Sequence, residues 1–451
     1  VKIAKESVPE EWGLSLHELH ALLTDEHGDA VASLEYFDPH CTIDSSDKSL
    51  YEAQLEFFKL SLEKGVIRWE SSKDSLKKFT EMDGSETGNW PLFCPEKDGS
   101  QAADPADINQ GDANDCWLLS AMMIAAAKDQ TGSNIISNLF VNYQEDGDTK
   151  DVQIVKFFRP DTGLWEYVVI DNAVPVRKPA ASGSQALAKP KYACSRQPET
   201  WVMLLEKAYA KWITSRVQAP VNKNPYENIN FGLIDEALVS FTGGVKSLIP
   251  LDTPEGQANA RSGALWNKLV EFQSKGYLLG ASTPSGHDAF WDEHGLVKGH
   301  AYAILSIMTT SPPSGVKSGS KIMLIRNPWG INPWDFDPPA HPSKDQPWPI
   351  KPLDWSPRSS MWQGKGAQNM KRKLQVSSNS GVDPGVFWIT YEDFVRSFAA
   401  IFCCRMLDGW ITYSKLSEWR EGRMGGVISG PSGFENPQWR LKVLKNTAAY
   451  F

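Results

Sequence analysis

Residues 110–127 read QGDANDCWLLSAMMIAAA, and they combine a cysteine with the longest nearly apolar run of the chain. From Cys116 to Ala127 this run is apolar on every face, which predicts a helix that is buried on all sides within a domain. Asp115 or Asn114 suits the N-cap position of that helix. The run is shorter than the ~20 residues that cross a bilayer, so we predict no transmembrane segment.

Composition limits what the chain can be. It has 451 residues, of which 41% are hydrophobic and 22% charged. These proportions exclude a disordered or collagen-like chain. The net charge of −9 without a basic stripe argues against nucleic acid as a partner. Six cysteines without a CxxC pair favour free thiols, and no apolar signal core follows Val1. We therefore expect a cytoplasmic protein, and the first residue, which is not Met, suggests a processed form or part of a longer chain.

Hydrophobic spacing predicts a helical half followed by a strand-rich half, which is an α+β arrangement. Residues 1–85 differ from the rest, because their apolar residues follow helical spacing through Ile67 and a polar break comes next. Residues 331–385 form a long irregular segment rich in Pro and Trp, and loops of this length are usually functional. Further elements are expected as helices at 200–215 and 264–274 and as strands at 152–158, 164–170, 277–281, 301–307, 321–326, 386–390 and 401–406.

Cys116 stands in the first turn of the predicted buried helix, where the helix dipole and the first backbone N–H groups favour an anion. This position lowers a thiol pKa from ~8.5 into the range of ~3.5–7.5, above all beside a histidine. Gln110 lies upstream across a Gly-containing turn. Its side-chain amide and the N–H of Cys116 would then form an oxyanion hole for acyl transfer. The alternative is a buried, inert cysteine that packs as a small hydrophobe.

A nucleophilic cysteine needs a base, and His300 at the start of an apolar strand is the main candidate. Asn327 ends the next strand, and its side-chain carbonyl is expected to accept from Nδ1–H of His300, as in the Cys-His-Asn form of the catalytic triad. Each residue has an alternative interpretation, as a structural histidine and as a turn asparagine. His287 and His294 lie in a polar loop and are weaker candidates.

Three motifs occur in order: Gln-Gly-x-x-x-Asp-Cys-Trp-Leu-Leu at 110–119, Lys-Gly-His-Ala-Tyr at 298–302 and Arg-Asn-Pro-Trp-Gly at 326–330. Together they resemble the cysteine protease core of the calpain family. Further matching segments begin at Leu204, Phe241 and Phe387. The resemblance covers residues 86–407 and continues into 408–451, which are similar to the start of the family's C2-like β-sandwich.

This resemblance implies a papain-like core of two subdomains. Residues 86–225 would carry the cysteine and residues 226–407 the histidine and asparagine. A segment of unknown role, 1–85, would precede the core, and a partial sandwich, 408–451, would follow it. The catalytic site would exist only when the two subdomains close on each other.

The resemblance also implies regulation by calcium, because closure in the family is driven by calcium bound within each subdomain. Asp107 and Glu199 match the acidic ligands of the first site, and the alternative is that they are surface carboxylates. The second site departs from the family pattern, since Pro333 and Val386 stand where the family has acids. Other acids lie nearby, namely Asp335, Asp337 and Asp383. We therefore expect one regulatory calcium, in the first subdomain.

The sequence thus predicts a calpain-like cysteine endopeptidase that makes limited cuts in protein substrates under calcium control. The site residues expected to act together are Cys116, His300, Asn327 and Gln110. A transglutaminase-like acyl transferase uses similar parts, but it prefers Asp as the third member. A catalytically silent scaffold is the alternative from a different class, although the four intact site residues disfavour it. In either case, residues 1–85 or the 331–385 loop would be where a regulatory partner binds.

Overall fold

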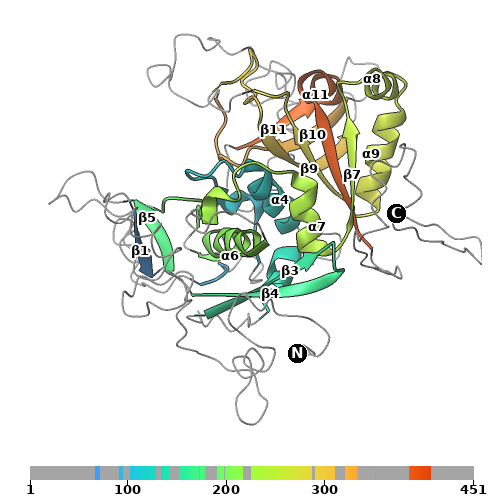
Figure 1. The fold of residues 1–451 in the computed structure, drawn as a ribbon. Helices are drawn as coiled ribbons and strands as arrows, with labels where there is room; N and C mark the ends of the chain where they lie inside the picture. Colours follow the sequence, from blue (N-terminus) through green and yellow to red (C-terminus); the bar gives the residue numbers. More distant parts are fainter. Residues whose placement is uncertain are drawn as a thin grey trace, which may run out of the picture.

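The computed structural model describes residues 67–71, 91–94, 102–127, 134–141, 152–171, 173–177, 190–197, 199–216, 225–286, 290–309, 320–333, 351 and 385–407. Two regions are visible in Figure 1, a helical one with small sheets and, above it, a larger sheet with helices. Helix α4 (Cys116–Ala126) lies between them. This order matches the predicted α+β arrangement of a helical half followed by a strand-rich half.

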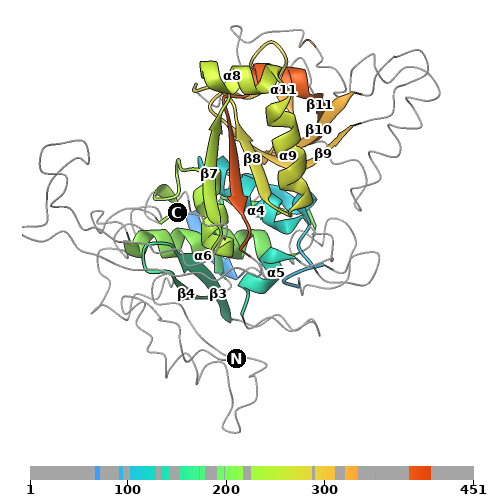
Figure 2. The same ribbon diagram turned by 90° about the vertical axis from the view of Figure 1, so that its right-hand side faces the viewer.

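The helical region is built around α4. Residues Trp117–Ala126 are all buried, as the apolar sequence on every face predicts. On one side lie α5 (Ile135–Leu139), α6 (Trp201–Arg216) and the hairpin of β3 (Val152–Arg159) and β4 (Leu164–Asp171), seen below α4 in Figures 1 and 2. Shorter pieces complete the region: η2 (Pro105–Asp107), β2 (Ile108–Asn109) paired with β6 (Cys194–Ser195), and β1 (Ile67–Ser71) paired with β5 (Ala173–Arg177).

The strand-rich region contains, within the described residues, a six-stranded antiparallel sheet of order β11-β10-β9-β8-β12-β7. Its strands are β7 (Val245–Pro250), β8 (Leu278–Ser282), β9 (Ala301–Thr309), β10 (Lys321–Arg326), β11 (Val386–Thr390) and β12 (Ala400–Arg405). The accompanying helices are α7 (Ile234–Thr242), α8 (Pro254–Arg261), α9 (Ala264–Ser274) and α11 (Tyr391–Ser397). Because β9 and β10 run antiparallel, the start of β9 and the end of β10 lie at the same edge of the sheet.

The hydrophobic core of the helical region extends onto one face of the sheet. Successive residues of a strand point to opposite faces of its sheet. On β9, Ala301 and Ala303 belong to the core around α4, whereas Tyr302 and Ile304 belong to the core under α9. The small alanine side chains let α4 lie close to the sheet, and α4 contacts both β8 and β9. The position of Cys116 relative to the sheet is therefore set by close packing.

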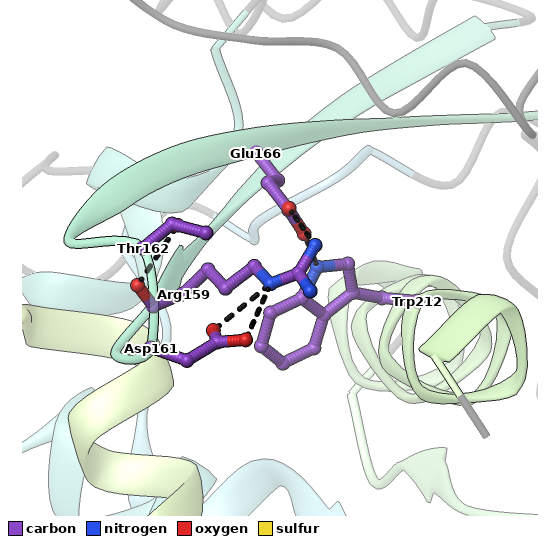
Figure 3. A network of polar contacts seen from close by, with 5 residues as sticks. All are labelled: Arg159, Asp161, Thr162, Glu166 and Trp212. Atoms are coloured by element: carbon purple, nitrogen blue, oxygen red, sulfur yellow. Dashed lines mark hydrogen bonds and ion pairs between the residues drawn. The ribbon is translucent and has the colours of Figure 1, made fainter. Parts of the chain in front are cut away.

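A polar network fastens the β3–β4 hairpin to α6. Glu166 on β4 is buried, and Figure 3 shows it between Arg159 and Trp212. Its carboxylate accepts from Nη1 of Arg159 at 2.9 Å and from Nε1 of Trp212 at 2.7 Å. Asp161 accepts a second bond from Arg159, at 2.9 Å. The buried carboxylate thus has the cationic and N–H partners that it needs away from water.

Most predicted elements of the core are confirmed, including helices α6 and α9 and strands β3, β4 and β8–β12. Helical spacing predicted a helix that reaches Ile67, and this prediction is wrong at Ile67. Residues 67–71 form strand β1, whose pairing partner β5 lies about a hundred residues further along the chain. The domain boundary expected at residue 85 stays a prediction. The other elements expected in residues 1–66, most of the 331–385 loop and the partial sandwich at 408–451 lie outside the described residues.

Candidate active site

Cys116 is the first residue of α4 and is half-buried. Asp115 occupies the N-cap position, and its backbone carbonyl accepts from the N–H groups of Leu118 and Leu119 at 2.8 and 3.0 Å. Its side chain makes no capping bond, contrary to the usual behaviour of Asp at this position. The thiol therefore stands at the positive end of a buried helix dipole, which stabilises a thiolate.

A neighbouring loop holds the segment before Cys116 in place. The backbone N–H of Asn114 donates to Oδ1 of Asn230 at 2.8 Å, and the N–H of Phe231 donates back to the carbonyl of Asn114 at 3.0 Å. Nε1 of Trp117 donates to the carbonyl of Ile229 at 2.8 Å. Phe231 has a φ of 64°, and its side chain is 80% exposed. Such a φ is strained for a residue other than Gly.

His300 and Asn327 meet at the edge of the sheet where β9 begins and β10 ends. Both side chains are buried, and Nε2 of His300 lies 2.8 Å from Oδ1 of Asn327. The expectation that Nδ1 would make this bond is wrong. Since Oδ1 is an acceptor, Nε2 carries the proton, and Nδ1 is then the nitrogen that can take up a proton from elsewhere.

The Asn327 amide is fixed by two further bonds. Its Nδ2 donates to the carbonyl of Ile331 at 3.0 Å, and its Oδ1 also accepts from the backbone N–H of Trp329 at 3.1 Å. These bonds assign the oxygen to the side that faces His300. The Trp329 ring packs against the His300 ring with centroids 5.1 Å apart, so the imidazole is held between its hydrogen bond and an indole.

Tyr302 is a second aromatic neighbour of His300. Its ring contacts the His300 ring edge-on, with centroids 5.1 Å apart. Burial raises the pKa of the Tyr302 phenol well above its ordinary value, a bond from the backbone N–H of Val297 opposes that rise, and the charges of Asp292 and then Cys116 add to it. The His300 ring is therefore packed by two aromatic rings, those of Tyr302 and Trp329. Helix α4, which begins at Cys116, packs against β9, which begins directly after His300.

Gln110 lies in the turn that leads into α4. Its Nε2 donates to the carbonyl of Ala113 at 2.8 Å, and its backbone N–H donates to the carbonyl of Pro328 at 2.9 Å. The following Gly111 has no room for a side chain, because a Cβ there would lie 2.2 Å from the Tyr192 backbone. Gln110 is thus held between the turn before Cys116 and the loop after Asn327. In this structure its side-chain amide bonds the Ala113 carbonyl within that turn.

Asp107 and Glu199 come together as a buried pair, so the surface interpretation is excluded. Glu199 accepts from the backbone N–H of Cys94 at 2.8 Å, from the hydroxyl of Ser195 at 2.7 Å and from Nε1 of Trp201 at 2.8 Å. Burial first, and then the charge of Glu199, raises the pKa of Asp107. Burial also raises the pKa of Glu199, although hydrogen bonds from Asp107 and the three donors oppose this.

The carboxylate oxygens of Asp107 and Glu199 fit a hard cation as ligands, because calcium prefers carboxylate and carbonyl oxygens. The described residues contain no group of three or more acidic, histidine or cysteine side chains placed to hold a metal, so backbone carbonyls or water would complete the coordination. In the second region, Pro333 is buried and Val386 lies in β11, and neither supplies a ligand. The acids at 335, 337 and 383 lie outside the described residues.

A second pair of buried acids escaped the sequence analysis. Asp115 and Glu206 are 0% and 1% exposed. Both oxygens of Glu206 accept from the backbone N–H of Ala193 at 3.1 Å. Burial raises the pKa of both acids, and the charge of Asp115 raises that of Glu206 further. Helical spacing places Glu206 away from the apolar face of Trp201, Leu205 and Trp212, so the sequence carries no signal of its burial.

A cysteine at the start of a buried helix, together with a His–Asn pair at the edge of the antiparallel sheet on which that helix packs, defines the papain-like class of cysteine protease core. Comparison with known proteins narrows the class, because residues 93–405 match the model of the calpain family cysteine proteases. The chain therefore belongs to the calpain family.

Relatives include Calpain-type cysteine protease ADL1 of Oryza sativa subsp. japonica, 34% identical over 352 residues that cover 78% of this chain and 14% of the relative. Calpain-type cysteine protease DEK1 of Zea mays has the same identity and coverage. Calpain-14 of Homo sapiens is 30% identical over 349 residues, or 75% of this chain and 43% of the relative. The chain thus spans less than half the length of these relatives. No helix of the described part is long and apolar enough to cross a membrane.

Proposed function

We propose that the chain is a cysteine endopeptidase in which Cys116 is the nucleophile, His300 the proton carrier and Asn327 the residue that orients the imidazole. The observation that carries this proposal is the 2.8 Å bond between Nε2 of His300 and Oδ1 of Asn327, made directly before β9, the strand on which the helix of Cys116 packs. This bond holds Nε2–H, so that Nδ1 is the nitrogen that exchanges a proton with the thiol.

The reaction follows from these positions. The proton of the Cys116 thiol passes to Nδ1 of His300, which gives a thiolate and an imidazolium. The thiolate attacks the scissile carbonyl, an S–C bond forms, and negative charge collects on the carbonyl oxygen. That charge would be met by the N–H of Cys116 and by the Gln110 amide, once the amide turns from the Ala113 carbonyl.

Two later steps complete the cycle. The C–N bond breaks while the proton on Nδ1 passes to the leaving amine, and a thioester remains on Cys116. Water then attacks the thioester, its proton goes to Nδ1, and the C–S bond breaks. The proton returns to the sulfur, the acid product leaves, and the enzyme is restored.

We also propose that Asp107 and Glu199 hold one regulatory calcium ion. Two buried carboxyls side by side cannot both ionise without a cation, and calcium would supply the charge that lets them do so. The pair lies on η2 and before α6, next to Ile108–Asn109, which leads to Gln110. Protein substrates and limited cutting are proposed on the family alone. A partner bound through residues 1–85 or the 331–385 loop is proposed on the sequence of those segments, above all the length and the Pro- and Trp-rich composition of the loop.

The test of the nucleophile is Cys116→Ser, assayed by casein digestion with and without calcium. We expect the loss of all measurable hydrolysis with an unchanged thermal unfolding temperature. Cys194→Ser is the matched control, because Cys194 is another half-buried thiol, on β6, and should retain activity. Activity of Cys116→Ser within about tenfold of wild type, which is about 1.4 kcal/mol in the barrier, would exclude this assignment and favour a different reaction centre or a non-catalytic scaffold.

A further inference from the structure

Arg326 is a fully buried arginine at the end of β10, directly before Asn327. A guanidinium group stays charged in proteins, and its burial costs free energy unless its N–H groups find acceptors. A leucine or methionine would fill the same space without that cost. The bonds of Arg326 therefore indicate what the charged side chain contributes here.

The guanidinium reaches from the sheet into the helical region. Its Nη2 donates to the carbonyls of Ala106 at 3.0 Å and Ile108 at 2.9 Å. Its Nη1 donates to the sulfur of Met123, which lies about two turns along α4 from Cys116. The two carbonyls belong to the residues on either side of Asp107. One rigid, planar group thus contacts the backbone on both sides of the proposed calcium ligand and the helix of the proposed nucleophile.

The same two segments meet again on the other side of Asn327. The backbone N–H of Gln110 donates to the Pro328 carbonyl at 2.9 Å. Arg196, which lies outside both segments, bridges them, because its Nη2 donates to the Gly330 carbonyl and its Nε to Oδ1 of Asn109 at 3.0 Å. Gly330 has a φ of 68°, and a Cβ there would lie 2.1 Å from Oδ1 of Asn109. Only glycine permits this approach. Residues 326–330 are therefore fastened to residues 106–110 at both ends.

We propose that Arg326 is a positioning residue that sets the His300–Asn327 pair against Cys116 and passes the state of the Asp107–Glu199 pair to it. This inference rests on the proposed protease function and adds to it. When Asp107 is ordered, the carbonyls of Ala106 and Ile108 are fixed in place. The guanidinium group of Arg326, which bonds both carbonyls, is then fixed with them. Asn327 is the next residue along the chain, and its Oδ1 lies 2.8 Å from the His300 ring.

Arg326→Lys is the informative variant, because it keeps the charge and loses the planar fork. Misplacement of a catalytic group by about 1 Å costs up to ~100-fold in rate. We therefore expect kcat for a peptide substrate to fall ~10–100-fold with KM changed less than about threefold. The calcium concentration that gives half-maximal activity should also move away from the calcium Kd measured by isothermal titration. Arg405→Lys, at the far end of β12, is the matched control and should behave as wild type.

A purely structural role for Arg326 would lower the folded fraction and leave kcat per folded molecule unchanged, and this result would overturn the proposal. If the half-maximal calcium concentration keeps the same ratio to the calcium Kd in Arg326→Lys as in wild type, Arg326 does not pass the state of the Asp107–Glu199 pair to the active site. If Arg326→Lys does not fold, Arg326→Gln gives the same comparison with a neutral donor. Failure of the proposed function would be recognised separately, since Cys116→Ser would then keep its activity whatever the Arg326 variants do.

Discussion

Two pairs of buried acids lie in the helical region, and they differ in their hydrogen-bond donors. Each pair joins a residue of the segment before α4 to a residue at or near the start of α6. Glu199 of the first pair receives N–H and O–H bonds from three residues, which favour its charged form. In the second pair, no N–H or O–H group of the described residues donates to the Asp115 oxygens.

The surrounding donors therefore decide what a buried acid pair can do. Donors already in place around Glu199 prepare the first pair to ionise, which suits it to a cation. Within the described part of the chain, the Asp115 oxygens have no such donor, and burial raises the pKa values of both Asp115 and Glu206, which favours a pair that keeps a proton. The two pairs are alike in residue type and burial but are predicted to differ in charge and in ligand.

The largest effect that separates the pairs concerns calcium. Asp107→Ala should weaken calcium binding by the whole chain at least ~100-fold, because it removes one of two charged ligands. Asp115→Asn and the exposed Asp252→Ala should leave the calcium Kd as in wild type. Isothermal titration measures all three. Calcium binding that survives Asp107→Ala, or two ions bound with comparable affinity, would contradict a single site at this pair.

A smaller effect is expected on stability. Glu206→Ala should lower the free energy of unfolding by about 2–4 kcal/mol, because it leaves a cavity and takes away the carboxylate that accepts from the N–H of Ala193. Glu206→Gln keeps the size and a donor toward Asp115, and it should stay within about 1 kcal/mol of wild type at pH 5. Urea unfolding gives both values. Equal losses in the two variants would show that the pair does not share a proton.

The smallest effect is the pH dependence of stability. Burial raises the folded-state pKa values of Asp115 and Glu206 above the unfolded values near 4. The folded state then binds more protons than the unfolded state, so the stabilisation is full below about pH 4 and is lost as the pH rises towards the raised pKa values. Asp115→Asn combined with Glu206→Gln removes this loss.

The double variant should therefore gain about 1–2 kcal/mol relative to wild type between pH 5 and pH 8. Urea unfolding at a series of pH values tests this sign. The Asp107–Glu199 pair titrates in the same direction in both proteins and cancels in the comparison. If the difference in the free energy of unfolding between the double variant and wild type stays constant with pH, Asp115 and Glu206 are not the groups whose pKa values are raised.

Local sequence was informative where local chemistry sets the structure. A helix that is apolar on every face has to be central, so the place of Cys116 at its start was predictable. His300 and Asn327 were also predictable as neighbours, because His300 stands at the start of one strand and Asn327 at the end of the adjacent strand. The nitrogen that bonds Asn327 was not, since ring orientation depends on how Tyr302 and Trp329 pack around it. The catalytic roles and the cytoplasmic location stay predictions.

Residues whose partners lie far along the chain were missed. Asp115 looked like an ordinary helix cap, and only the packing of α6 behind it makes it half of a buried pair. Arg326 looked like the polar end of a strand, although its acceptors lie about 220 residues earlier. Strand β1 was taken for helix because its partner β5 is also remote. In each case a long-range contact overrides the local pattern.

The core shared by the two regions has a mechanical consequence. Helix α4 contributes side chains to the helical region and also packs against Ala301 and Ala303 of the sheet, so a wide opening between the regions would expose the apolar surface of a whole helix. Movement that preserves this contact is a slide of packed surfaces, which keeps the displacement small. The two regions should therefore unfold as a single cooperative unit, and cleavage of the chain between them should yield fragments that stay associated.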